Sequence, residues 1–134
     1  MVVENRIEDL HIELQRWKSQ LQFIEDEMHF IQKLLNSYVF EPRTPNLFER
    51  LEQFKQEFKE SKREKERIKK LILGHERHLG GIFECTSEVC DDSYYEKHDG
   101  LRNRILEYLD NYLKLKAKVY NYAGSVLKRR KPVD

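Results

Sequence analysis

The chain has 134 residues, enough for one domain with a modest core. Charged residues make up 37% of it and hydrophobic residues 39%, a composition that favours long solvent-exposed helices over a β-rich fold. The 25 basic and 24 acidic residues leave a formal net charge of +1, so no overall charge draws the chain to nucleic acid or to an anionic membrane. No apolar run approaches the roughly 20 residues of a membrane span, and the N-terminus lacks a signal-peptide pattern. We therefore expect a soluble, cytoplasmic protein.

The first segment carries apolar residues in alternating steps of three and four, from Ile7 to Tyr38. This is the a/d spacing of a heptad repeat, in which one narrow seam of the helix faces a partner helix. Asn5 and Glu8 have the spacing of a capping box at its start. The pattern predicts a helix over about residues 6–40.

The second segment repeats the same spacing from Leu47 to Leu79, after a Thr-Pro pair typical of a helix start. Its middle is polar, because Ser61 and Lys65 occupy positions of the seam. Two glycines follow the last seam residue and favour a helix end. The sequence predicts a second helix over about residues 45–79.

Lys65 needs a partner or a route to water, because burying an unpaired ammonium group is costly. Folding the segments back on one another places Lys65 level with Ser19 and Gln20 of the first helix and with Glu107 and Asn111 of the third. We expect the Lys65 ammonium to extend out of the core toward these polar side chains.

The third segment has an a/d pattern from Tyr94 to Val126. Ser93 and the glutamate three residues later again have the spacing of a capping box. The sequence predicts a loop over about residues 80–92 and a third helix over about residues 93–127.

These three segments define the fold class, because long amphipathic helices bury their seams by packing on one another. The sequence predicts an all-α protein, an up-down-up antiparallel three-helix bundle with coiled-coil-like heptad packing. It predicts a single domain that spans residues 1–134.

A second apolar stripe lies about 100° round the third helix from its core seam, with a lesser version on the first helix. Either these helices need a broad apolar face to touch two neighbours, or the extra stripes are a surface for self-association. The second interpretation predicts a homodimer that acts as a non-enzymatic interaction or scaffold module. The stripe residues are Leu106, Leu109, Leu113, Tyr120 and Leu127 on the third helix, and Phe23, Phe30 and Leu34 on the first.

Four of the five histidines and both cysteines are expected near one end of the bundle. Zinc prefers neutral imidazole and thiolate ligands, so a small zinc-binding bundle is an alternative function. The spacing is not that of a zinc ribbon or of a metalloprotease helix, and we expect no bound cofactor. The candidate ligands are His11, His75, His78, Cys85, Cys90 and His98.

Motifs for catalysis are absent from the sequence, which has no glycine-rich phosphate loop, nucleophile elbow or dinucleotide fingerprint. We expect no enzymatic activity. A further alternative is weak binding of nucleic acid or a membrane surface through the basic tail, residues 128–134, which begins with Lys-Arg-Arg-Lys. Four cations at a helix end also complement the helix dipole, so nucleic-acid binding is not expected. The basic run over residues 62–70 is interleaved with glutamates and is interpreted as a solvated helix face.

Overall fold

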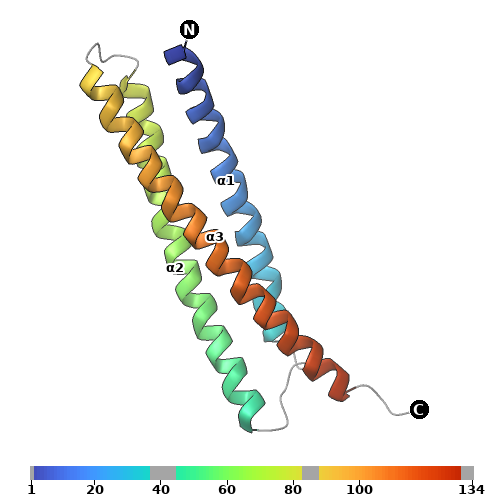
Figure 1. Ribbon diagram of the computed structural model, residues 1–134. Coiled ribbons are helices and arrows are strands. Elements are labelled where there is room, and N and C mark those ends of the chain that lie inside the picture. Colours follow the sequence, from blue (N-terminus) through green and yellow to red (C-terminus); the bar gives the residue numbers. More distant parts are fainter. Residues whose placement is uncertain (1, 37–44, 83–87, 131–134) are drawn as a thin grey trace.

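The protein is a bundle of three long helices in the computed structural model, which describes residues 2–36, 45–82 and 88–130. The helices are α1 (Val2–Leu35), α2 (Pro45–Ile82) and α3 (Glu88–Arg130). Figure 1 shows α1 and α3 running in the same direction, with α2 antiparallel to both. The backbone of α1 packs on α2 and that of α2 on α3, which confirms the predicted all-α three-helix bundle. None of the described helices is both long and apolar enough to cross a membrane.

The start of α3 differs from the sequence expectation. The helix begins at Glu88 rather than near residue 93, so the connection from α2 is shorter than predicted and Ser93 lies inside the helix. The sequence over residues 88–92 is rich in acidic residues, a composition typical of helix starts because the helix dipole favours negative charge there. At its other end α3 continues to Arg130 and includes the first residues of the predicted basic tail.

The bounds of the first two helices also differ by a few residues. The α1 helix starts at Val2 and ends at Leu35, where the Asn36 amide donates a hydrogen bond to the Gln32 carbonyl at 3.0 Å. The α2 helix continues through the two glycines to Ile82. The seams are unaffected by these shifts, because they lie well inside the helices.

The core is formed by the predicted heptad seams. Within the described side chains, every apolar seam residue from Leu10 to Leu35, from Leu51 to Leu79 and from Tyr94 to Tyr122 is buried. Full burial of one large apolar side chain contributes about 1.5–3 kcal/mol, so these layers supply most of the stabilisation of the bundle. The most completely buried apolar side chains are Leu14, Ile31, Phe58, Ile68 and Val119.

The polar residues in the middle of α2 are accommodated inside the bundle. The Ser61 hydroxyl donates a hydrogen bond to the Tyr108 hydroxyl at 3.2 Å. The Lys65 ammonium lies 3.3 Å from a carboxylate oxygen of Glu25 and 3.3 Å from one of Glu66, with no well-directed hydrogen bond to either. The expectation that Lys65 extends outward is therefore wrong, because its charge is neutralised by carboxylates while its side chain stays buried.

Candidate functional site

Two histidines at core positions meet in the interior of the bundle. His75 of α2 is 6% exposed and His98 of α3 is 0% exposed. The Nε2 atom of His75 lies 2.9 Å from the Nδ1 atom of His98. The heptad seam explains this meeting, because it places both residues on the buried faces of adjacent antiparallel helices.

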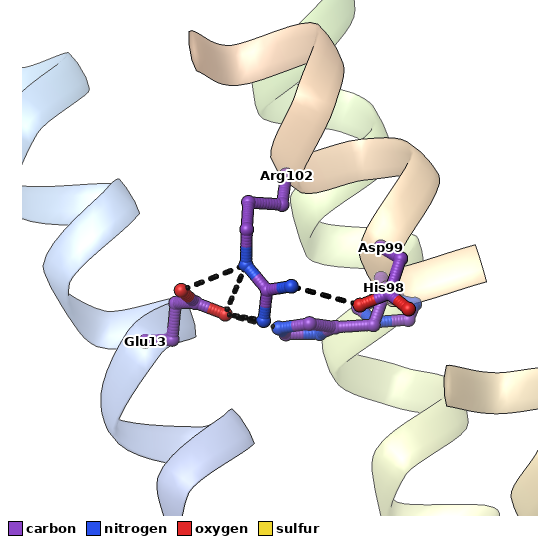
Figure 2. A network of polar contacts seen from close by, with 5 residues as sticks. Glu13, His98, Asp99 and Arg102 are labelled. Carbon is purple, nitrogen blue, oxygen red and sulfur yellow. Dashed lines mark hydrogen bonds and ion pairs between the residues drawn. The ribbon is translucent and has the colours of Figure 1, made fainter. Parts of the chain in front are cut away.

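A carboxylate from the third helix of the bundle completes the contact. Glu13 of α1 accepts a hydrogen bond from His98 Nε2 at 2.6 Å. The Arg102 guanidinium donates hydrogen bonds to both oxygens of the same carboxylate, from Nη2 to Oε1 at 2.6 Å and from Nε to Oε2 at 3.1 Å. The Nη1 atom of Arg102 donates a further hydrogen bond to Asp99 at 2.8 Å. Figure 2 shows Glu13 facing Arg102 and His98 across the space between α1 and α3.

These contacts fix the direction of the hydrogen bonds. A carboxylate paired with arginine only accepts, so His98 carries its proton on Nε2 and donates it to Glu13. The Nδ1 atom of neutral His98 then accepts, and His75 carries its proton on Nε2. The hydrogen-bond chain runs in one direction, from His75 on α2 through His98 on α3 to Glu13 on α1.

Aromatic rings enclose the histidine pair. The Trp17 ring stacks on His98 with a centroid distance of 4.7 Å, and the Tyr94 ring stacks on His75 at 4.0 Å and 5°. The Tyr94 hydroxyl is buried without a hydrogen-bond partner in the part of the chain that the structure describes. Burial also raises the pKa of Tyr94, so this hydroxyl stays protonated.

The burial sets the charges of the site. It lowers the pKa of His75 to about 4, and the nearby His98, His78 and Lys97 act in the same direction. Burial also lowers the pKa of His98, although Glu13 opposes this shift. The hydrogen bond from Arg102 is the main reason that the pKa of Glu13 lies below its usual value. At neutral pH the site therefore contains two neutral imidazoles and one ionised carboxylate.

The arrangement limits what the histidines can do as metal ligands. Both ring nitrogens of His98 and one of His75 are engaged in hydrogen bonds, and a metal ion would have to displace these bonds. His11 and His78 are exposed on the surface. Among the side chains that the structure describes, no group of three or more histidine, cysteine, aspartate or glutamate residues is arranged to hold a metal ion.

The cysteines of the predicted zinc set lie beyond what the structure describes. Cys85 is outside the described residues, and Cys90 lies in α3 with its side chain outside them. The zinc site thus stays a prediction. The structure brings His75 and His98 together and leaves His11 and His78 at the surface.

Sequence reasoning missed Glu13 and Arg102. Each is adjacent in the chain to a buried seam residue, since Glu13 precedes Leu14 and Arg102 follows Leu101. Residues beside a seam often form ion pairs between neighbouring helices, and this is the signal that points to them. The spacing alone does not single out one such pair from the many charged residues along the helices.

A second candidate site lies on the surface between α1 and α3. Glu27 of α1 accepts hydrogen bonds from Lys116 at 2.7 Å and from Tyr112 at 2.6 Å, both on α3. Four large apolar side chains lie three or four residues from this ion pair along their own helices, and Leu106 continues their α3 stripe seven residues before Leu113. We call this set the α1–α3 patch: Phe23 (64% exposed), Phe30 (60%), Leu106 (57%), Leu113 (61%) and Tyr120 (41%).

The α1–α3 patch contains five of the eight residues predicted as an oligomer interface. Leu34 and Leu109 are partly buried and pack against the core, so they expose less apolar surface than the patch residues do. The side chain of Leu127 lies outside the described ones. The extra stripes are thus largely exposed in the described part of the single chain, and are not needed to fill its interior.

Fold and site together define an all-α three-helix bundle with a buried polar chain across its helices. Comparison of the sequence and the structure with protein-family models, with curated proteins and with solved structures finds no match.

Proposed function

We propose that the protein is a non-enzymatic helical interaction module that self-associates through the α1–α3 patch. The observation that carries this proposal is the set of four exposed large apolar side chains beside the Glu27–Lys116 ion pair, with exposed Leu106 one heptad further along α3. Contiguous exposed apolar surface is costly in water, and on soluble proteins it commonly marks an interaction site.

The spacing of the patch favours a second copy of this chain as the partner. Leu106, Leu113 and Tyr120 follow one another at seven-residue intervals along α3. A twofold axis at Leu113 brings two antiparallel α3 helices together, with Leu106 opposite the partner's Tyr120 and Leu113 opposite the partner's Leu113. Such a surface is self-complementary, as a twofold interface requires.

Three further features are compatible with this pairing. Phe23 and Phe30 of α1 are exposed and add apolar surface to the α1–α3 patch. Ala117, between Leu113 and Tyr120, is small and exposed and leaves room for a helix to approach. The formal net charge of +1 produces little repulsion between two copies.

Sedimentation equilibrium of the full chain over a range of concentrations tests the proposal. The wild-type protein is expected to show a dimer mass, and the double variant Leu106→Glu and Leu113→Glu a folded monomer with unchanged helical content. The double variant Ile12→Glu and Phe48→Glu is the matched control, because it adds the same charges at exposed apolar positions outside the patch. A wild-type monomer at all concentrations would overturn the proposal, as would a dimer that survives glutamate at both leucines.

A further inference from the structure

A groove between α2 and α3 is lined by glycines and basic side chains. Its volume is about 400 Å³, within the usual range of small-molecule sites. The α2 wall and the α3 wall each contain a glycine, and four basic or protonatable side chains surround them. These residues are Lys70, Gly74 and His78 on α2, and Lys97, Gly100 and Arg104 on α3.

Neither glycine is explained by the backbone or by helix packing. No described glycine has a positive φ angle. A Cβ atom at Gly100 would meet nothing within 4 Å, and one at Gly74 would meet only the tip of Arg77 at 4.0 Å. Glycine inside a helix is less stable than alanine, because more conformational freedom is lost on folding. Two such glycines facing one groove therefore lower stability, and their structural effect is to keep the groove open.

The groove is positively charged. No carboxylate lines it. Arg104 is held by Glu64 at 2.7 Å, whereas Lys70, His78 and Lys97 have no hydrogen-bond or ion-pair partner within the described residues. Unpaired cations around a recess raise the local concentration of anions and can donate charge-assisted hydrogen bonds.

Part of the lining of the groove is apolar. The exposed Leu71 and the buried Leu101 supply its apolar lining, together with His75. A ligand that fits this surface has a compact anionic head and a small apolar body. A phosphate monoester has the better-matched head, because its three oxygens and double charge can engage the three unpaired groups together.

We propose that the α2–α3 groove binds a small phosphate monoester with an apolar body. The phosphate lies between Lys70, His78 and Lys97, and the body lies over Leu71 and Leu101. The glycines provide the space for this body. The site is separate from the α1–α3 patch and does not depend on self-association.

Titration of the ¹⁵N-labelled full chain with phenyl phosphate, followed by amide NMR shifts at low ionic strength, tests this site. Saturable shifts are expected at Gly74 and Gly100, smaller ones with inorganic phosphate, and none with phenol at the same concentration. Sodium phenylacetate, which joins a carboxylate to the same apolar ring, distinguishes a phosphate site from a general anion site. Equal affinity for phenylacetate and phenyl phosphate would overturn the choice of phosphate.

Variants identify which residues carry the binding. Gly100→Leu fills the groove and is expected to raise the melting temperature while weakening phenyl phosphate binding at least about tenfold. Gln53→Leu adds the same side chain at an exposed position of α2 outside the groove and is expected to leave binding unchanged. Lys70→Gln combined with Lys97→Gln is expected to abolish saturable binding, with Lys59→Gln as its control. Uniform, non-saturating shifts, or wild-type affinity in Gly100→Leu, would overturn the proposal.

Discussion

Acidification is expected to destabilise the bundle well above the pH at which carboxylates titrate, because of His75. In the folded protein burial lowers the pKa of His75 from 6.5 to about 4. The unfolded chain exposes this imidazole and binds a proton as the pH falls through 6.5, while the folded protein does not. The unfolded state therefore binds more protons between pH 6.5 and 4, and stability falls with pH across this window.

The size of the effect follows from the two pKa values of His75. A shift of one pKa unit corresponds to about 1.4 kcal/mol, so the whole window is worth about 3 kcal/mol. Integrated from pH 7 to pH 5, the loss from His75 alone is about 2 kcal/mol. The pKa of His98 is also lowered, so its contribution has the same sign. Protonation of Glu13, whose pKa lies below its usual value, adds a further loss only at lower pH.

Urea unfolding followed by circular dichroism at pH 7, 6 and 5 measures this loss. Protein concentration must be held constant, because self-association would itself contribute to the free energy of unfolding. In His75→Gln the side-chain amide can still donate to His98 but does not titrate, so this variant is expected to lose less stability between pH 7 and 5. His29→Gln is the matched control, because it removes an exposed histidine outside the buried chain.

Two results would refute this reasoning. One is a free energy of unfolding that does not change between pH 7 and 5. The other is an equal loss of stability in the wild-type protein and in His75→Gln, which would assign the pH dependence to other groups.

Two further substitutions test the packing of the core. Lys65→Leu removes a buried ammonium that lacks a well-directed hydrogen bond, while the partly exposed Glu25 stays in contact with water. It is expected to raise the free energy of urea unfolding by about 1 kcal/mol, and a loss of similar size would show that the ion pair is net stabilising. Phe58→Ala is expected to cost about 3–5 kcal/mol by thermal unfolding, because Phe58 is 0% exposed. The exposed Phe48→Ala should cost less than about 0.5 kcal/mol, and equal costs would contradict the burial described.

The fold follows from the sequence because the heptad period appears directly in the order of residues. Every apolar seam residue whose side chain is described, from Leu10 onward, lies in the core. The period also placed His75 and His98 inside the bundle, where they meet. It did not reveal the buried chain that they form with Glu13, because a seam gives the face of a residue and not its partner on another helix.

The axial offset between neighbouring helices was harder to predict from the sequence. Spacing along each helix leaves the offset between neighbours open by about a turn, since that offset depends on how the seams interdigitate. Lys65 was therefore expected opposite Gln20 but lies beside Glu25, five residues further along α1. The start of α3 was missed for a different reason, because Ser93 matched a capping pattern inside a helix that begins at Glu88.

The chain of hydrogen bonds from His75 through His98 to Glu13 has a consequence for how the bundle is assembled. Heptad seams are nearly periodic, so sliding one helix past another by seven residues would keep much of the apolar packing. Sliding α3 would separate His98 from both of its partners, whereas sliding α1 would separate it from Glu13 and sliding α2 from His75. Each ring nitrogen left unpaired in the interior costs about 1–3 kcal/mol. The three residues come from three different helices, so a penalty opposes the displacement of each helix. The hydrogen-bond chain thus adds little to the free energy of unfolding, but it disfavours bundles in which one helix is shifted along another.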